Sequence, residues 1–236
     1  MIQILEKYTE KYPLQHIGEV AGICWNSDIS DKEKNIKRAK TCIQGGHTRT
    51  CEYPDVELII SGYSARCIRE LYTHIIGTTR LQESTRYVDM KDFGYFTPPK
   101  ISADKNIKGL YQSGIENIKE TYTKMEEAGI TKEDAANILP LGMDTKIVWK
   151  INLRGLMHFM EMRLCNRAYH EIRKLSNEVK TALSEYSEEW KWIADNYFVP
   201  KCAVAGYCTE AQCCGLKPRK KDIVIITREE YENLKK

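Results

Sequence analysis

Apolar and polar residues alternate along two short stretches of this chain, which is the pattern of half-buried β-strands. In the first stretch Val56, Leu58 and Ile60 alternate with polar neighbours. Two other short stretches are mostly apolar and predict further strands. Residues 1–12 predict a short strand or the entry of a helix, which Pro13 ends. The predicted strands cover residues 17–24, 55–61, 146–151 and 223–226.

Between these stretches, apolar residues recur at the three-to-four spacing of amphipathic helices. The clearest stripe follows Ser64, a good N-cap residue, and runs from Cys67 to Ile76 before Gly77 ends it. A variant capping box at Thr131 opens a brief helix. Residues 87–96 are aromatic and predicted to be extended. The other predicted helices cover residues 30–42, 102–129, 153 to about 175, 176–197 and the end of the chain from 227.

No internal repeat or low-complexity linker divides the 236 residues. We therefore predict one α+β domain over residues 1–236, with a small, mostly antiparallel sheet flanked by long helices. A cysteine-rich C-terminal extension occupies about 198–236. Cys202, Cys208, Cys213 and Cys214 lack the tight spacing of common zinc sites. A reduced, packed thiol cluster is therefore favoured over zinc or a redox pair, and no metal site is predicted.

Composition narrows the classes of function. Hydrophobic residues make up 42% and charged residues 29%, as in an ordinary globular protein. A formal net charge of +3 is too small to indicate a nucleic-acid partner. No apolar stretch is long enough to span a membrane, and the first residues lack a secretory signal pattern. Nine cysteines without such a signal indicate reduced thiols, so a cytoplasmic protein is expected.

Candidate chemistry gathers in residues 73–87, which read T-H-I-I-G-T-T-R-L-Q-E-S-T-R-Y. Arg80 and Arg86 stand there with a histidine, hydroxyls and amides, directly after an apolar stripe. Guanidinium and backbone N–H groups that converge at such a point make an anion or phosphate pocket. A surface turn with an accidental pair of arginines explains the spacing equally well.

A second polar group lies on the predicted helix that begins N-L-R-G-L-M-H-F-M-E-M-R-L-C-N-R. Its polar members can point along neighbouring faces of the helix. An ordinary charged face, with glutamates of the same helix as ion-pair partners, accounts for the same pattern. The polar residues are Asn152, Arg154, His158, Arg163 and Arg167.

Four short motifs, in the same order, resemble those of the flavin-dependent thymidylate synthases. Q-E-S-T-R-Y matches the second half of the family's R-H-R…S-x-R signature at Ser84 and Arg86. With one residue inserted, His74 falls on the histidine of R-H-R, and both flanking arginines are lost. The polar helix resembles N-x-R-x-L…R-L-C-x-x-A-Q-W-E-I-R, and G-H-T-R-T-C-E-Y resembles G-H-x-S-P-x-E-H. K-E-D-A-A-N-I-L-P resembles A-R-E-x-A-R-x-x-L-P, with Ala136 in place of an arginine. The resemblance covers roughly residues 17–175.

The resemblance implies two sets of binding residues. Flavin adenine dinucleotide (FAD) is expected against His47, Glu52, His74, Arg80, Asn152, Arg154, His158 and Arg167. A pyrimidine nucleotide is expected against Glu70, Gln82, Glu83, Ser84, Arg86 and Arg163. Arg80 is expected to restore one of the lost arginines. Arg163 and Ser84 are expected to act in catalysis, the guanidinium by stabilising charge on the uracil oxygens and the hydroxyl by donating near the phosphate.

The implied reaction is reductive methylation of dUMP to dTMP. Methylenetetrahydrofolate gives the carbon, FAD carries the hydride and NADPH reloads the flavin. The family builds its active sites between subunits, commonly in a homotetramer, so self-association is expected. The departures leave alternatives open: another pyrimidine nucleotide (UMP or dCMP), hydroxymethylation, or a flavin- and nucleotide-binding protein with weakened turnover. An Arg-rich nucleic-acid-binding module is a further alternative, against which the low net charge counts.

Overall fold

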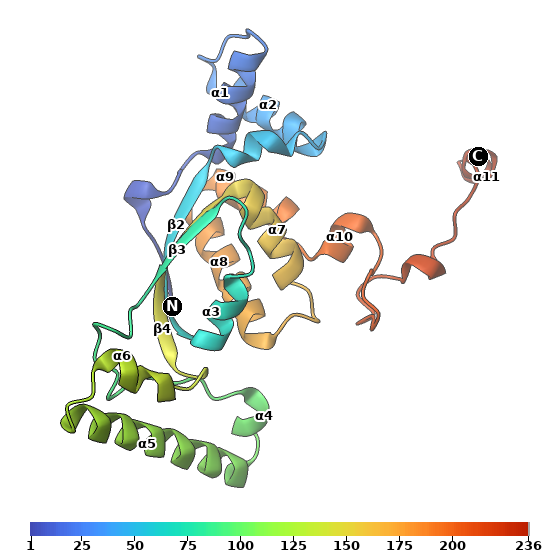
Figure 1. The fold of residues 1–236 in the computed structure, drawn as a ribbon. Helices are drawn as coiled ribbons and strands as arrows, with labels where there is room; N and C mark the ends of the chain where they lie inside the picture. The colour runs from blue at the N-terminus through green and yellow to red at the C-terminus, as the bar shows by residue number, and fades with distance from the viewer. Residues whose placement is uncertain (236) are drawn as a thin grey trace.

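One antiparallel sheet of four strands, in the order β1-β2-β4-β3, forms the centre of the computed structural model, which describes residues 1–235 (Figure 1). β2 and β4 pair in the middle, with Leu58 opposite Trp149. β1 pairs with β2 and β3 pairs with β4, so both are edge strands. The strands are β1 (Ile2–Ile4), β2 (Asp55–Ser64), β3 (Thr78–Gln82) and β4 (Asp144–Asn152).

Eleven α-helices accompany the sheet within residues 1–235, which confirms the predicted α+β class. Short 3-10 turns lie at Glu6–Tyr8, Thr48–Glu52, Ala136–Ile138 and Lys220–Asp222. The α-helices are α1 (Pro13–Cys24), α2 (Lys32–Gln44), α3 (Ala65–Leu71), α4 (Pro99–Ser102), α5 (Lys105–Glu127), α6 (Lys132–Ala135), α7 (Leu153–Arg163), α8 (His170–Tyr186), α9 (Glu188–Tyr197), α10 (Lys201–Ala205) and α11 (Arg228–Leu234).

The main core lies between one face of the sheet and the helices α3, α7, α8 and α9 (Figure 1). Alternate residues of β2 and β4 point into it because strand side chains alternate between faces. Trp149, Phe159 and Trp190 are among the largest fully buried side chains. The indole of Trp149 also donates a hydrogen bond of 2.7 Å to Thr78 Oγ1, which joins the edge strand β3 to the core.

A buried carboxylate fixes the junction between β2 and α3. Glu171, in the first turn of α8, is 1% exposed and accepts hydrogen bonds of 2.6 Å from both the backbone N–H and the hydroxyl of Ser64. The Ser64 hydroxyl in turn accepts from the Cys67 N–H at 3.1 Å, which confirms it as the N-cap of α3. This chain of contacts sets the direction in which α3 leaves the sheet.

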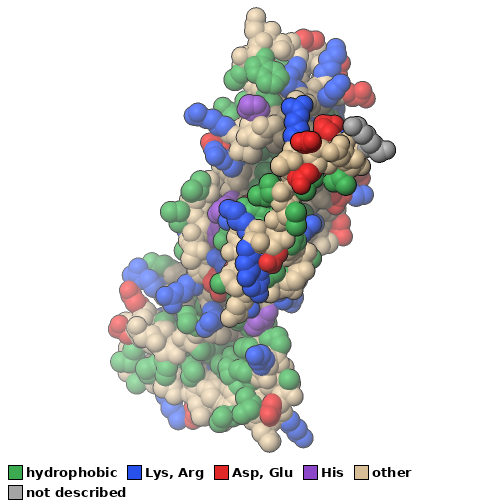
Figure 2. Space-filling model, turned by 90° about the vertical axis from the view of Figure 1, so that its right-hand side faces the viewer, with side chains coloured by type: hydrophobic (Ala, Val, Ile, Leu, Met, Phe, Trp, Pro, Cys, Tyr) green, Lys and Arg blue, Asp and Glu red, His purple; other side chains and the backbone are tan. Residues whose placement is uncertain are grey.

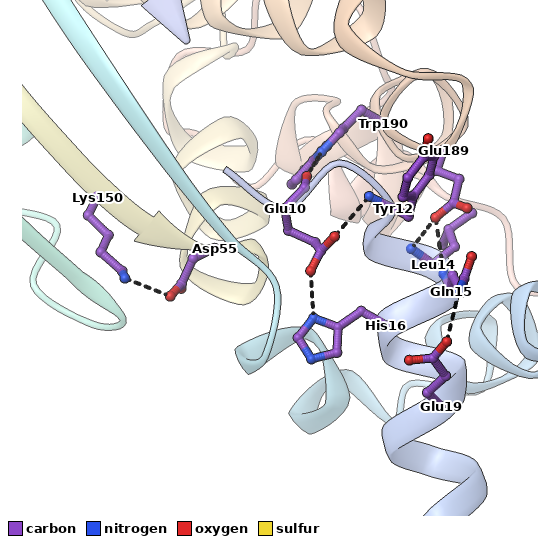
Figure 3. A network of polar contacts seen from close by, with 10 residues as sticks. All are labelled: Glu10, Tyr12, Leu14, Gln15, His16, Glu19, Asp55, Lys150, Glu189 and Trp190. Carbon is purple, nitrogen blue, oxygen red and sulfur yellow. Dashed lines mark hydrogen bonds and ion pairs between the residues drawn. The ribbon is translucent and has the colours of Figure 1, made fainter. Parts of the chain in front are cut away.

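A second buried carboxylate joins the first helix to α9 (Figure 3). Glu189 accepts from the backbone N–H of Leu14 at 2.7 Å and of Gln15 at 3.0 Å, so it satisfies amides that the helix itself leaves unpaired. The indole of Trp190 donates to the Glu10 carbonyl at 2.7 Å. Burial raises the pKa of the Glu189 carboxyl above its usual value.

Helices α4, α5 and α6 form a lobe at the opposite end of the molecule from α1 and α2 (Figure 1). Two small apolar clusters hold this lobe together. One contains Met90, Tyr122 and Ala135, and the other contains Phe93, Ile115 and Met143.

The chain beyond α9 leaves the body of the molecule and carries α10 and α11 (Figure 1). None of the nine cysteines forms a disulfide within residues 1–235, and Cys208 is buried whereas Cys214 is exposed. In the same range no three His, Cys, Asp or Glu side chains are grouped so that they could hold a metal ion. Figure 2, which views a face at right angles to Figure 1, shows separate groups of basic side chains interspersed with apolar and acidic ones. Every helix of residues 1–235 is too short or too polar to span a bilayer.

The strands predicted at 55–61 and 146–151 are confirmed, but those at 17–24 and 223–226 are wrong. Residues 17–24 belong to α1, where Ile17 and Ala21 are buried one turn apart. Pro13 opens this helix as its first residue, a position where proline has no N–H to satisfy. Residues 223–226 pair with no strand in the described part of the chain, and Ile225 is 92% exposed. The capped helix predicted from 227 is confirmed, with a capping box at Thr227.

Four predicted helices have different limits in the structure. The one predicted over 176–197 is divided at Ser187, the N-cap of α9, into the end of α8 and the whole of α9. The stripe from Cys67 to Ile76 is helical only as far as Leu71, and β3 follows where no strand was predicted. The helix predicted from 153 to about 175 is broken, since α7 ends at Arg163 and α8 begins at His170. The long helix predicted over 102–129 begins after its N-cap Asp104, whose side chain accepts from two backbone N–H groups.

Candidate active site

A cavity of 660 Å³ lies between the end of α3 and helix α7. After Leu71 the chain follows an irregular turn, residues 72–77, before β3 begins. Gly77 adopts a φ of 66°, which favours glycine, and so allows the chain to pass from the turn into the strand. The cavity mixes apolar, cationic and backbone groups. It is lined by Thr73, His74, Ile75, Ile76, Arg154, Gly155, His158, Met162 and Arg163.

The guanidinium of Arg163, the last residue of α7, is held on several sides by residues of α3 and the turn. Its Nε donates to His74 Nε2 at 2.9 Å, and its Nη1 contacts Glu70 Oε2 at 3.0 Å. Its Nη2 donates to Thr73 Oγ1 at 3.0 Å and to the Glu70 carbonyl at 3.4 Å. Because these contacts come from three residues, the cation is fixed in one orientation at the cavity wall.

His74 is an uncharged hydrogen-bond acceptor in this arrangement. Since its Nε2 accepts from Arg163, the neutral ring carries its proton on Nδ1. Burial lowers the pKa of His74 to about 4, and the charges of Arg163, His158 and Arg80 act in the same direction. The ring packs edge-on against Phe159, with the ring centroids 5.0 Å apart. The imidazole therefore stays neutral at physiological pH and leaves the positive charge of Arg163 uncompensated on that side.

The first turn of α7 closes the other side of the cavity. The side chain of Asn152 caps the helix by accepting from the Gly155 N–H at 2.9 Å, and its backbone N–H donates to the Gly77 carbonyl at 2.8 Å. A Cβ on Gly155 would lie 2.6 Å from the Ile76 carbonyl oxygen, so only glycine permits this close approach of helix and turn. Arg154 forms an ion pair with Glu52 and so joins α7 to the 3-10 turn that follows α2.

Comparisons with known proteins agree on one family. The family model described as "Thymidylate synthase complementing protein" matches residues 5–187. The chain is 31% identical to the flavin-dependent thymidylate synthase of Clostridium tetani, over 95% of this chain and 96% of that protein. It is 32% identical to the flavin-dependent thymidylate synthase of Thermococcus onnurineus, over 88% and 89% of the two chains. The chain belongs to this family.

A solved structure of the same family shares the fold. The flavin-dependent thymidylate synthase of Helicobacter pylori, in complex with FAD and dUMP, matches with a TM-score of 0.60 at 21% identity. The match covers 75% of this chain and 93% of that chain. The recognition of a flavin-dependent thymidylate synthase from four short motifs is thus confirmed.

The residues expected to hold the flavin fall into two groups. His74, Arg154 and His158 line the cavity, and Asn152 and Glu52 directly support it as the cap of α7 and the partner of Arg154.

The other three do not line the cavity. Arg80 binds the backbone of the turn at residues 72–77, where it donates to the His74 carbonyl. His47 is exposed and precedes the 3-10 turn at Thr48–Glu52. Arg167 is exposed in the break between α7 and α8. Their roles toward the flavin stay predictions.

The residues expected to hold the nucleotide are divided in a similar way. Glu70 and Arg163 meet at the cavity, whereas the other four members lie at the end of β3 or after it and do not line the cavity. Gln82 donates to Thr145, and Arg86 forms an ion pair of 3.0 Å with Glu133.

The remaining two lie on the same loop. Glu83 lines a different cavity of 440 Å³, and the Ser84 hydroxyl accepts from the Arg86 backbone N–H at 3.3 Å. In one chain, therefore, the two halves of the family signature do not line the same cavity.

Five residues of the cavity wall were not among the predicted site residues. Thr73 is small and polar, and Gly155 has no side chain, so no sequence pattern distinguishes them from ordinary turn and helix residues. Ile75 and Ile76 belong to the predicted apolar helical stripe, and Met162 is not assigned a role by the sequence patterns. Their exposure, 72% and 76% for the two isoleucines, shows instead an apolar surface at the cavity.

Proposed function

We propose that this chain converts dUMP to dTMP by reductive methylation, with methylenetetrahydrofolate as the carbon donor, FAD as the hydride carrier and NADPH as the reductant. Membership of the flavin-dependent thymidylate synthases over nearly the whole chain carries the proposal. The geometry that supports it is the cavity between the turn at 72–77 and α7, with one fixed arginine in its wall.

The residues at this cavity fit a flavin. Ligand cavities are commonly about 300–1,000 Å³, mostly apolar and with a few fixed polar groups. Here Ile75, Ile76 and Met162 supply apolar surface for a ring system, while Arg154 and His158 supply donors for the phosphates. FAD bound there would supply the hydride for the methyl group.

Arg163 is the residue best placed to act on the pyrimidine. Its guanidinium is held by neutral His74 and by Thr73, so little reorganisation is needed when negative charge develops on a uracil oxygen. Glu70 balances part of this charge before the nucleotide binds, since its carboxylate lies 3.0 Å from Nη1. The chain itself thus provides orientation and charge stabilisation.

We further propose that two copies of the chain complete each site, in a homotetramer. The segment with Ser84 and Arg86 does not line the cavity of its own chain, although it carries half of the signature. The exposed Ile75 and Ile76 give the cavity an apolar rim of the kind that a second subunit covers.

The first test is direct. The purified protein should absorb in the visible region as a flavoprotein and form dTMP from dUMP when folate donor and NADPH are added. Arg163→Ala should lower turnover by about 10²–10³-fold, the cost of removing one donor to a developing oxyanion. A protein that neither retains FAD nor forms dTMP contradicts the proposal. Product from UMP or dCMP, but not from dUMP, would assign a different nucleotide.

The second test concerns the shared site. Arg86→Ala and Arg163→Ala should each retain about 1% of wild-type activity or less when alone. In oligomers that contain both variants at random, about one site in four receives both native arginines if they come from different chains, so activity should return to about a quarter of wild type. If both arginines act from the same chain, no activity returns.

A further inference from the structure

Arg80 reaches from the edge strand β3 back to the turn that forms the cavity wall. It pairs with Trp149 across the sheet, and paired residues of antiparallel strands share a face, so its side chain points to the side on which α3 lies. Its Nη1 donates to the His74 carbonyl at 2.7 Å and its Nη2 to the Tyr72 carbonyl at 3.0 Å. The guanidinium also lies over the ring of Tyr72, 4.4 Å from its centroid.

These contacts give the turn hydrogen-bond donors for two of its backbone carbonyls. Beyond the end of α3 the carbonyls of Tyr72 and His74 have no helical partner, and a cation at the C-terminal end of a helix is favourable for such groups. β3, although an edge strand, is paired along its length with β4 and is therefore a firmer anchor than a loop. Arg80 therefore ties an irregular segment to the rigid sheet by two charge-assisted hydrogen bonds.

Two arginines therefore hold His74, one through its backbone and the other through its ring. Arg80 binds its backbone carbonyl, and Arg163 donates to its ring at Nε2. Thr73, which lies between the two carbonyls bound by Arg80, accepts from Arg163 as well. A shift of the turn would thus move two of the partners that orient the Arg163 guanidinium.

We propose that Arg80 is a positioning residue of the active site: by holding the turn at residues 72–74 it fixes His74 and Thr73, and through them the guanidinium of Arg163. Arg80 is not part of the cavity wall, so this role requires no contact with flavin or nucleotide. This role differs from the direct flavin contact expected from the sequence. The kinetic consequence rests on the proposed function, whereas the effect on His74 does not.

The kinetic test compares Arg80→Ala and Arg80→Lys with Arg69→Ala. Arg69 is an exposed arginine of α3 whose side chain makes no hydrogen bond or ion pair with any of residues 1–235, so it controls for loss of charge near the turn. Arg80→Ala should lower kcat/KM for the nucleotide by about 10–100-fold, the range for a small misplacement of a catalytic group. Arg80→Lys should recover part of this loss, because an ammonium can reach one carbonyl but lacks the planar fork. Arg69→Ala should stay within about twofold of wild type.

A second measurement separates positioning from general loss of structure. In the holoenzyme with ¹³C-labelled histidine, the ring signal of His74, assigned with His74→Gln, should titrate at higher pH in Arg80→Ala than in wild type. The charged groups that act on His74, namely Arg163, His158 and Arg80, all lower its pKa, and looser packing removes part of the burial that lowers it most. Loss of the Arg80 charge by itself raises the pKa of His74, so Arg80→Lys, which keeps the charge, is the deciding comparison: a higher titration of His74 in this variant reports looser packing of the turn.

The outcomes are distinct. An unchanged His74 titration together with kinetics equal to those of Arg69→Ala would overturn the proposal. If wild type forms no dTMP, the proposed function fails, but the His74 titration still tests the role of Arg80.

Discussion

Replacing His74 with glutamine should change how the stability of this protein depends on pH. The folded state lowers the pKa of His74 from 6.5 to about 4, chiefly through burial. Between these values the unfolded chain binds more protons than the folded one, so stability rises with pH across this window. The contribution of neutral His74 is complete above about pH 6.5 and is lost as the pH falls toward about 4.

The magnitude follows from the shift. At 1.36 kcal/mol for each pKa unit, the full shift corresponds to roughly 3 kcal/mol. The ring is half-buried, so screening by solvent reduces this to about 1–2 kcal/mol. Urea unfolding of wild type and His74→Gln, at equal protein and salt concentration from about pH 7 to about pH 4.5, measures the difference. His47→Gln is the matched control, because His47 is exposed.

As the pH falls over this range, we expect the free energy of unfolding to decrease by about 1–2 kcal/mol more in wild type than in His74→Gln. His47→Gln should show the same decrease as wild type. Stability curves for wild type and His74→Gln that run parallel down to about pH 4.5 would refute the reasoning. They would mean that the imidazole is as easily protonated in the folded state as in the unfolded chain.

Two further predictions concern residues that fix the cavity wall and the direction of α3. Gly155→Ala should lower the free energy of unfolding by about 1–3 kcal/mol and weaken flavin retention, because the new Cβ displaces the Ile76 carbonyl from the cavity wall. Flavin absorbance after gel filtration measures the retention. A variant that retains flavin fully would show that the wall adapts without loss of binding. Glu171→Ala should lower the free energy of unfolding by about 3–5 kcal/mol, because it leaves the buried N–H and hydroxyl of Ser64 without their hydrogen-bond acceptor. Thermal unfolding checks this, with an unchanged midpoint as the contrary result.

Much of the sheet could be predicted from the sequence because alternation is a local signal. The two central strands alternate strictly, and Ser64 is both the end of one strand and the cap of the next helix. The end of α3 could not be predicted, because Ile75 and Ile76 continue the apolar spacing after the helix has stopped. Periodicity reports that a residue is apolar, but it does not distinguish a core position from one on an exposed rim.

The site was predictable only in part, for a related reason. Motifs identify residues that share a function, but not which chain supplies them. His74 and Arg163, 89 residues apart, do meet in one chain. Arg86 instead meets Glu133, 47 residues further on, and the motif that contains Glu133 gave no sign of this pairing. Arg80 was singled out as a replacement for a lost charge, yet the carbonyls that it binds are invisible in any sequence pattern.

The cap that Glu189 provides for α1 has a consequence for how the protein is made. The carboxylate lies 175 residues after the Leu14 N–H that it accepts from, so during synthesis the first helix leaves the ribosome long before its cap exists. The family match stops at residue 187, two positions short of this carboxylate. A fragment trimmed to the family boundary would therefore keep all four motifs and still lack the carboxylate that caps its first helix.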